Sequence, residues 1–376
     1  MKRRPQLVCV VGARPNFMKI APIYTALERQ GAIDPILVHT GQHYDETMKD
    51  TFFRQLGIPE PDLDLEVGSG SHAVQTAQIM QRFEPVLEDV PPFAVLVVGD
   101  VNSTIACGLV AAKKQVPLIH VEAGLRSGDR TMPEEINRVL TDQLSALLFT
   151  TERAARDNLL SEGIAEDKIY FVGNVMIDSL LGHLDQAVPP AETLARQGRK
   201  WPLNSNNNAS DYAVLTLHRP SNVDDPEVLG RLLQTLTEIS RRMPIIFPCH
   251  PRTGKMIERF GLDGLIAESG IISTPPLGYL EMLGLIRSAR LVLTDSGGLQ
   301  EETTALGVPC VTLRENTERP ITITEGTNTL VGSDPDAIFT CVEDILDAGG
   351  KRGRIPARWD GKAAQRIVQV IEEKLL

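Results

Sequence analysis

Short runs of apolar, often β-branched residues alternate with longer amphipathic stretches along this 376-residue chain. Such short runs are typical of strands buried on both faces, and the longer stretches between them leave room for crossover helices. This order is typical of repeated βαβ units, in which parallel strands form a sheet that helices cover on both sides. We therefore predict an α/β fold of the doubly wound kind.

The apolar runs form two series, which predict two sheets. The first series of expected strands covers residues 7–11, 36–38, 94–98, 117–121, 147–150 and 169–172, and the second covers 213–217, 245–248, 271–273, 291–294, 310–313 and 329–331. Because the chain is too long for one ordinary hydrophobic core, we predict two domains, 1–174 and 175–360. We expect the polar segment 201–211 to be a mobile loop, and about 361–376 to be an amphipathic helix that packs back on a domain.

Composition argues against several classes of partner. With 38 Lys and Arg against 49 Asp and Glu, the net charge of −11 makes nucleic acid and anionic membranes poor partners. No apolar segment is long enough to span a membrane, and the run at 7–11 is too short for a signal peptide. The five cysteines contain no C-x-x-C pair, which predicts reduced thiols in the cytoplasm. The spacings of Cys and His match no metal site.

Polar residues follow most of the expected strands directly. They are Gly12 to Arg14, His39 to His43, Gly99-Asp100 and Glu122 to Gly124 in the first half, and His218-Arg219, His250 to Arg252 and Asp295 to Gly298 in the second. In doubly wound sheets, ligands bind at the carboxyl ends of the strands. We therefore expect one crevice in each half and an active site between the two domains.

One of these junctions suits a phosphate. Ser296, Gly297 and Gly298 open an expected helix, whose first N–H groups and dipole attract an anion. The same residues also fit a simpler interpretation, in which Ser296 caps the helix and acidic residues complement its dipole. Glu302 in that helix could instead accept hydrogen bonds from ribose hydroxyls.

Positively charged residues near two other junctions also suit a phosphate group. Arg14 and Lys19 lie at the first strand-to-helix junction, where two positive charges suit a pyrophosphate, and Arg319 adds a third cation from the second half. The alternative for Arg14 and Lys19 is a solvated basic turn.

Three carboxylates are candidates for proton transfer. Asp100 and Glu122 end expected strands, and Glu134 follows Pro133, which suits the first position of a helix. Clustered carboxylates raise one another's pKa toward values useful for acid and base catalysis. The alternative for Glu134 is that it complements the dipole of that helix and forms an ion pair with Arg138, four residues further along.

Two histidines, His218 and His250, end strands in the second half. A single histidine in such a place is more often a structural hydrogen-bonding group than a catalyst.

Taken together, these motifs resemble the non-hydrolysing UDP-N-acetylglucosamine 2-epimerases. They are GARPNFMK (12–19), TGQH (40–43), GDVNST (99–104), HVEAGLRS (120–127), MPEEINR (132–138), TLHR (216–219), TDSGGLQEE (294–302) and TERP (317–320). The resemblance spans nearly the whole chain, and the motifs occur in the same order.

The resemblance implies the glycosyltransferase type B architecture, with two Rossmann-like domains facing a central cleft and the last helix crossing back to the first domain. It implies inversion at C2 between UDP-N-acetylglucosamine and UDP-N-acetylmannosamine, without NAD, metal or another cofactor. In the implied mechanism, a carboxylate removes the C2 proton as UDP leaves C1, and UDP then adds back to 2-acetamidoglucal after protonation of the opposite face. The resemblance also implies a cytoplasmic homodimer that supplies polysaccharide or cell-envelope synthesis.

The resemblance also assigns residues. Asp100, Glu122 and Glu134 match the acid and base carboxylates, in an order that stays open, and His218 matches the catalytic histidine. The substrate-binding positions are Arg14, Lys19, Arg138, Ser296, Gly297, Gly298, Glu302 and Arg319. Some bacterial members bind a second UDP-N-acetylglucosamine as an activator, and Gln42, His43 and His250 are candidates for such a site. Residues 44–46 are Tyr-Asp-Glu where those members carry a further glutamine.

Other functions stay open from the sequence. A sister epimerase that acts on UDP-2,3-diacetamido-2,3-dideoxy-glucuronate shares the strings TGQHYD (40–45) and CHPRT (249–253), although an acidic sugar should require an extra cation near C6. A hydrolysing epimerase would release free N-acetylmannosamine. A UDP-sugar glycosyltransferase would not need three carboxylates, and a silent nucleotide-sugar sensor would be expected to have lost one of them or His218.

Overall fold

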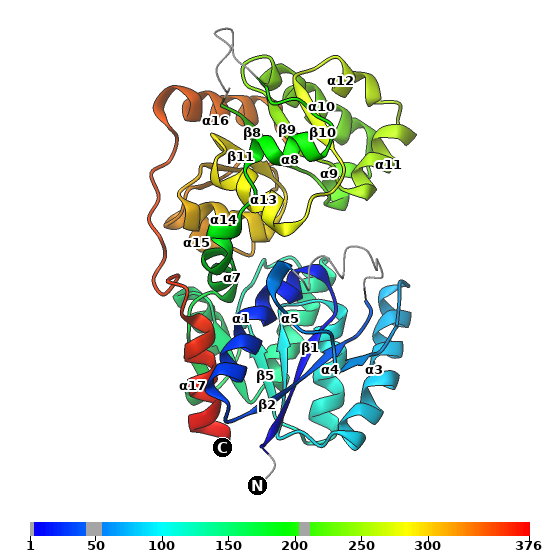
Figure 1. Cartoon of the computed structure of the whole chain (residues 1–376), viewed down its shortest axis with the longest axis vertical. Helices are drawn as coiled ribbons and strands as arrows, with labels where there is room; N and C mark the ends of the chain where they lie inside the picture. Colours follow the sequence, from blue (N-terminus) through cyan, green and yellow to red (C-terminus); the bar gives the residue numbers. More distant parts are fainter. Residues whose placement is uncertain (1–3, 43–54, 203–210) are drawn as a thin grey trace. The chain divides into compact units, whose positions relative to one another are not determined.

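The computed structural model describes residues 4–42, 55–202 and 211–376, and it divides the chain into two compact units (Figure 1). One unit comprises Met1–Gly182 together with Ala357–Leu376, and the other comprises His183–Pro356. The expected domain boundary at residue 174 lies just before helix α7 (Val175–His183), most of which groups with the first unit.

The first unit contains a seven-stranded parallel sheet in the order β3-β2-β1-β4-β5-β6-β7. The strands are β1 (Gln6–Val11), β2 (Asp34–His39), β3 (Leu63–Asp64), β4 (Ala94–Val98), β5 (Leu118–Val121), β6 (Leu147–Thr150) and β7 (Ile169–Phe171). All six strands expected in this half are confirmed, whereas β3 was missed because two residues carry no periodic pattern. The order reverses between β1 and β4, which is where ligands bind in this class of sheet.

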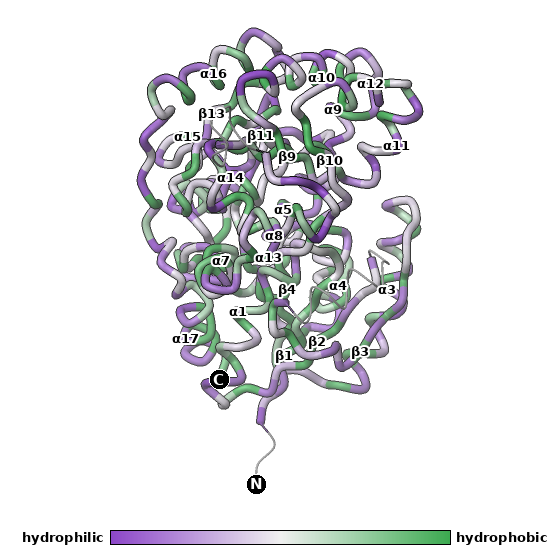
Figure 2. The backbone as a smooth tube through the Cα atoms, turned by 45° about the horizontal axis from the view of Figure 1, so that its top comes forward, coloured by the Kyte–Doolittle hydropathy of each residue, from purple (hydrophilic) through white to green (hydrophobic). Residues whose placement is uncertain are grey.

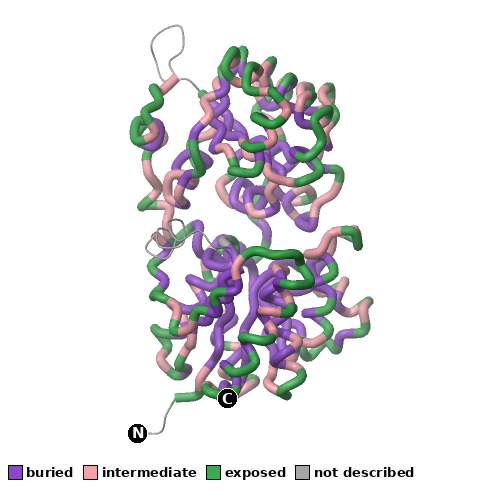
Figure 3. The backbone as a smooth tube through the Cα atoms, turned by 90° about the vertical axis from the view of Figure 1, so that its right-hand side faces the viewer, coloured by how far each residue is buried: buried purple, intermediate pink, exposed green. Residues whose placement is uncertain are grey.

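Helices surround this sheet. They are α1 (Arg14–Gln30), α3 (His72–Asp89), α4 (Asn102–Lys113), α5 (Pro133–Leu144), α6 (Arg153–Ser161), α7 and α17 (Ala363–Leu375). The strands are largely hydrophobic in Figure 2 and buried in Figure 3, as expected for a sheet covered on both faces. Helix α17 packs against α1, and Gln30 of α1 donates a hydrogen bond of 2.6 Å to Glu372.

The second unit contains a six-stranded parallel sheet in the order β10-β9-β8-β11-β12-β13. The strands are β8 (Ala213–Thr216), β9 (Ile245–Pro248), β10 (Ile271–Thr274), β11 (Leu291–Thr294), β12 (Cys310–Thr312) and β13 (Asn328–Leu330), and each confirms an expected strand. The helices are α8 (Pro190–Arg196), α9 (Pro220–Val223), α10 (Pro226–Ser240), α11 (Pro251–Arg259), α12 (Asp263–Ala267), α13 (Tyr279–Arg287), α14 (Gly297–Leu306), α15 (Pro320–Thr324) and α16 (Pro335–Ala348). The order reverses between β8 and β11.

Two sequence expectations concern single features of the fold. All five cysteines are free thiols, and burial raises the pKa of Cys9 to about 12 with a smaller contribution from the charge of Asp62. Most of the expected loop 201–211 lies outside the described residues. Among the helices that the structure describes, none has the length and hydrophobicity needed to cross a membrane.

Candidate active site

The first group of candidate residues lies at the ends of β4 and β5, which are neighbours in the first sheet. Asp100 follows β4 after Gly99, and Glu122 follows β5 directly. Glu122 has a φ of +76°, a left-handed conformation that costs a non-glycine residue free energy and is found mostly where the surroundings enforce it. The backbone N–H groups of Glu122 and Ala123 both donate to the Phe149 carbonyl at 3.0 Å, which holds the turn in place.

Glu122 pairs with the cation that we assigned to the first junction. Nζ of Lys19, from α1, lies 2.9 Å from Oε1 and 2.8 Å from Oε2 of Glu122, and both side chains are buried. Position 99, which directly precedes Asp100, is a glycine with a φ of +66°, and a Cβ there would come within 2.8 Å of the same Nζ and require the ammonium group to shift. The interpretation of Lys19 as part of a solvated basic turn is therefore wrong.

Asp100 is held by Arg138 of α5. The guanidinium donates to Oδ2 of Asp100 through Nε at 3.1 Å and Nη2 at 2.5 Å, while Nη1 donates to Glu135 at 2.7 Å. The alternative ion pair between Glu134 and Arg138 is wrong, because Glu135 is the neighbour that faces the buried side of α5. Glu134 is the half-buried second residue of that helix.

The second unit presents His218 after β8. Its Nδ1 lies 2.8 Å from Oδ1 of Asp295, a fully buried carboxylate that follows β11 and also accepts the backbone N–H groups of His218 and Arg219. Burial acts to raise the pKa of Asp295, but the hydrogen bond and charge of His218 and the backbone N–H groups outweigh it and lower this pKa. Because Nδ1 is engaged, Nε2 is the ring nitrogen that can reach a ligand.

The first turn of α14 holds the candidate phosphate-binding residues. Ser296 precedes the helix, and Gly297 and Gly298 are its first two residues. Ser296 is the N-cap residue, as the simpler interpretation expected, but within the described chain its side chain accepts no capping hydrogen bond. A Cβ at Gly297 would come within 2.4 Å of Oε1 of Glu318, so the glycine lets a charged side chain approach the start of the helix.

Glu318 and Arg319 belong to a buried ionic cluster beside this turn. Glu318 accepts from Arg314 at 2.8 Å and lies 3.7 Å from Arg219, and Nε of Arg319 lies 2.8 Å from Glu301. Burial acts to raise the pKa of Glu318, but the three guanidinium groups hold it well below its ordinary value. A phosphate at this helix would therefore meet arginines that are already organised by carboxylates.

Glu302 follows Glu301 on α14 and is buried. Burial and the negative charge of Glu302 both raise the pKa of the Tyr279 hydroxyl on α13, so Tyr279 stays neutral beside this carboxylate.

The remaining candidates have diverse surroundings. Oε1 of Gln42 accepts from the backbone N–H of Ser103 at 3.1 Å and from its hydroxyl at 2.7 Å. His250 precedes α11 and accepts from the N–H of Arg252, and its ring lies 5.7 Å from that of His218. His43 and the side chain of Arg14 lie outside the described part of the chain, although Arg14 is the first residue of α1.

The comparison with known families decides the relationship. Residues 25–372 match the family described as UDP-N-acetylglucosamine 2-epimerase. The chain belongs to this family.

Relatives in this epimerase family cover nearly the whole chain. The UDP-N-acetylglucosamine 2-epimerase of Methanocaldococcus jannaschii is 44% identical over 97% of this chain and 98% of its own. The UDP-2,3-diacetamido-2,3-dideoxy-D-glucuronate 2-epimerase of Pseudomonas aeruginosa is 43% identical over 97% of this chain and 99% of its own. Overall identity therefore does not separate the neutral from the acidic sugar.

Solved structures of epimerases confirm the fold class of two Rossmann-like domains. The Methanocaldococcus jannaschii enzyme in complex with UDP-GlcNAc and UDP matches with a TM-score of 0.89 at 43% identity, covering 98% of this chain and 99% of that one. The Neisseria meningitidis enzyme bound to UDP-GlcNAc matches with a TM-score of 0.88 at 30% identity, covering 98% and 100%.

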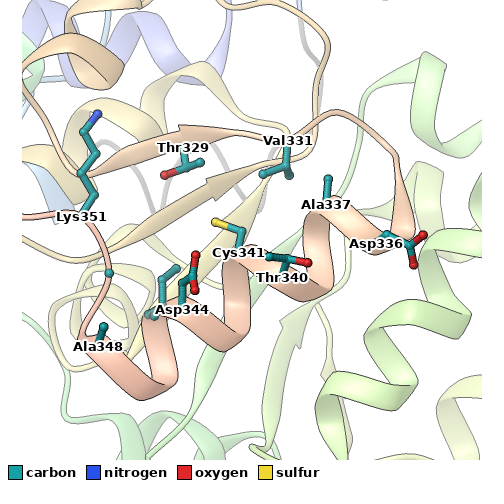
Figure 4. A pocket seen from close by; sticks show the side chains of 11 residues that line it. Thr329, Val331, Asp336, Ala337, Thr340, Cys341, Asp344, Ala348 and Lys351 are labelled. Atoms are coloured by element: carbon teal, nitrogen blue, oxygen red, sulfur yellow. The ribbon is translucent and has the colours of Figure 1, made fainter.

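A cavity of about 670 Å³ lies elsewhere in this epimerase-family chain, between β13 and α16 (Figure 4). Its lining includes Thr329, Cys341, Asp344 and Lys351 and none of the candidate residues. Among the described residues, no group of three or more His, Cys, Asp and Glu side chains is placed to hold a metal ion.

Sequence reasoning missed the partners that hold the candidates. Asp295 was noted only as part of a turn, and Glu135 and Glu301 were not singled out as partners. A carboxylate that ends a strand next to a strand ending in histidine was the one available signal for Asp295. No signal separates Glu135 from Glu134 before the buried face of α5 is known.

Proposed function

We propose that this protein interconverts UDP-N-acetylglucosamine and UDP-N-acetylmannosamine by inverting C2 of the sugar. The observation that carries the proposal is that Asp100 and Glu122 emerge from adjacent strand ends of one sheet, each paired with a cation. Inversion through proton removal and return needs acid and base groups that reach both faces of one carbon.

The reaction is an elimination followed by an addition. A carboxylate takes the C2 proton, the electron pair of the C2–H bond forms the C1–C2 double bond, and UDP leaves C1 with the electrons of the C1–O bond. Protonation of C2 of 2-acetamidoglucal from the opposite face and return of the UDP oxygen to C1 complete the inversion. Asp100, Glu122 and Glu134 are the proposed acids and bases, and the order of their roles stays open.

The second unit is proposed to hold the nucleotide. The N–H groups at Gly297 and Gly298, the hydroxyl of Ser296 and the α14 dipole suit the diphosphate, whereas the backbone N–H of Ser296 already donates to the Thr294 hydroxyl at 2.9 Å. Glu302 is the proposed acceptor for ribose hydroxyls. His218, oriented by Asp295, is proposed to face the diphosphate as the C1–O bond breaks. Arg14, Lys19 and Arg319 are proposed to stabilise the same charge, and Arg138 to lie near the sugar.

The wider setting is part of the proposal on family grounds. We propose a cytoplasmic homodimer that uses no cofactor and supplies polysaccharide or cell-envelope synthesis. Gln42, His43 and His250 remain candidates for a second UDP-sugar site.

Proton NMR in D₂O tests the reaction. The protein with UDP-N-acetylglucosamine, and no added NAD or metal, should form UDP-N-acetylmannosamine that carries deuterium at C2. The relative from Pseudomonas aeruginosa makes UDP-2,3-diacetamido-2,3-dideoxy-glucuronate the second substrate to offer. Exchange with that sugar alone would reject the neutral sugar, and a protein that binds UDP but exchanges neither sugar would reject the epimerase proposal.

Substitution of the carboxylates tests their roles. Asp100→Asn and Glu122→Gln should each lower kcat by at least about 10²-fold, the usual cost of losing a proton-transfer group, while UDP binding is retained. Glu88→Gln, which changes an exposed carboxylate paired with Lys114, is the control and should leave kcat unchanged. Near-normal turnover in both active-site variants would contradict the assignment.

A further inference from the structure

A fully buried histidine–aspartate pair lies behind the two strand-end carboxylates. His120 is on β5 and Asp142 is on α5, and neither side chain has any solvent exposure. Nδ1 of His120 lies 2.7 Å from Oδ1 of Asp142. None of the roles proposed above uses this pair.

The other ring nitrogen reaches the turn that carries Asp100. Nε2 of His120 lies 2.8 Å from the carbonyl oxygen of Gly99. A carbonyl oxygen only accepts, so Nε2 carries a hydrogen and donates it. Gly99 has a φ of +66° and directly precedes Asp100, so the ring fixes the peptide group from which this carboxylate projects.

The other oxygen of Asp142 reaches the turn that carries Glu122. Oδ2 accepts the backbone N–H of Gly124 at 3.1 Å and lies 2.8 Å from Nη2 of Arg126. Gly124 has a φ of +79°, and a Cβ there would come within 2.4 Å of the Ala155 carbonyl oxygen. Asp142 therefore holds the second turn from one side while Phe149 holds it from the other.

We propose that the His120–Asp142 pair is a positioning device that sets the spacing of Asp100 and Glu122. The inference rests on the proposed function, because inversion at C2 requires two proton-transfer groups at a fixed separation. One buried pair that binds the backbone of both turns supplies that constraint without touching substrate. Displacement of a reacting group by about 1 Å can lower a rate by about 10²-fold, so the pair acts on turnover more than on binding.

Two substitutions of His120 test its contact with Gly99 and its contact with Asp142 separately. In His120→Asn, the amide nitrogen can occupy the place of Nδ1, which keeps the contact with Asp142 and removes the contact with Gly99. In His120→Gln, the amide nitrogen can reach the place of Nε2, which keeps the contact with Gly99 and removes the contact with Asp142. Each variant should lower kcat at least about tenfold, with the KM for UDP-N-acetylglucosamine and the Kd for UDP within about threefold of wild type.

Hydrogen exchange at C2 gives a readout that a general loss of stability would not change. In D₂O the wild-type protein should exchange the C2 proton and invert C2 together, whichever epimer it starts from. If one carboxylate is displaced, the other can still remove the C2 proton of its own epimer to form 2-acetamidoglucal and return a deuteron to the same face. That epimer then exchanges its C2 proton without inversion. We expect His120→Asn and His120→Gln to uncouple exchange from inversion in opposite epimers.

The matched control is Tyr212→Phe. The buried hydroxyl of Tyr212 donates to the carbonyl oxygen of Leu285 at 2.7 Å, so this variant removes a buried contact between a side chain and the backbone without touching either turn. We expect it to keep the kcat and the exchange ratio of wild type. Folded His120 variants that behave like this control would overturn the inference while leaving the epimerase proposal intact, whereas a wild-type protein that does not invert C2 would reject the epimerase proposal itself.

Asp142→Asn covers the case in which the His120 variants do not fold. Its amide can donate to Nδ1 of His120 and accept from Gly124, so the shape and the hydrogen bonds persist while the charge is removed. If the pair acts only by positioning the two turns, this variant should keep a kcat within about tenfold of wild type and should still exchange the C2 proton together with inversion. A loss of about 10²-fold or more with the fold intact would overturn positioning in favour of a charge effect.

Discussion

Contacts with charged partners, at least one of them buried in each case, hold most of the catalytic candidates in place. Glu122 contacts Lys19, Asp100 contacts Arg138, and His218 contacts Asp295. Removing one partner of a buried pair leaves an uncompensated charge, so such variants change stability and activity together. Uncharged substitutions next to the pairs therefore give cleaner tests.

Gly99→Ala is such a substitution. A Cβ at this position would lie 2.8 Å from Nζ of Lys19, so we expect the ammonium group to move away from Glu122 and kcat to fall at least about tenfold. Gly163→Ala is the matched control, because its φ of +82° imposes similar backbone strain and nothing lies within 4 Å of the added carbon. Equal kcat values in steady-state assays of the two variants would contradict the proposed role of the Lys19–Glu122 contact.

The sequence predicted the identity of many candidate residues but not their partners. Asp100 and Glu122 could be singled out because polar residues after buried strands collect at one edge of a parallel sheet. The pairing of His218 with Asp295 depends on β8 and β11 being neighbours, although some 75 residues separate them in the chain. That Arg138 pairs with Glu135 and not with Glu134 depends on which face of α5 is buried.

At the scale of elements, the strands were the most predictable part. A run such as 94–98, which is wholly apolar and mostly β-branched, is typical of a strand buried on both faces of a sheet of this kind. The docking of helix α17 could not be read from periodicity alone. It depends on Asp178 of α7, which accepts the N–H groups of Ala363 at 3.1 Å and Ala364 at 2.8 Å.

Asp178 makes the stability of the contact between α7 and α17 depend on pH. Burial raises its pKa to about 6, although the two backbone N–H groups act to lower it. Because the folded state then binds a proton more tightly than the unfolded state, this stabilisation is fully present below about pH 4 and is lost as the pH rises through 6. The free energy of unfolding of wild type relative to Asp178→Asn should fall by about 2–3 kcal/mol between pH 4 and pH 7.5.

Urea unfolding of both proteins at the two pH values measures this difference. Asp360→Asn is the contrasting control, because the hydrogen bond from Arg366 lowers the pKa of exposed Asp360 and the effect of pH should have the opposite sign. A difference between wild type and Asp178→Asn that does not depend on pH would contradict the prediction.

At the scale of the whole molecule, most of the residues proposed to hold the nucleotide belong to the second unit. UDP at about 100 times its Kd stabilises the state that binds it by about 2.7 kcal/mol. In hydrogen exchange followed by mass spectrometry, UDP should therefore protect the amides of 296–302 and 314–319. Helix α3 in the first unit should show no direct protection.

Gly297→Ala provides the control for this measurement. The added carbon would lie 2.4 Å from Oε1 of Glu318, so we expect UDP binding to weaken at least about tenfold and the protection to disappear. Protection that persists in this variant at the same UDP concentration would place the nucleotide elsewhere.

The order of the chain has a consequence for biosynthesis. The first unit is discontinuous, because the strands of its sheet end at Phe171 while the helix that covers α1 begins at Ala363, after the entire second unit. A ribosome therefore releases the whole first sheet well before it has translated the residues that shield α1. Nascent chains expose that apolar surface while the second unit is being made, and transiently exposed apolar surface of this kind favours aggregation. The unit that emerges first is thus the last to be completed.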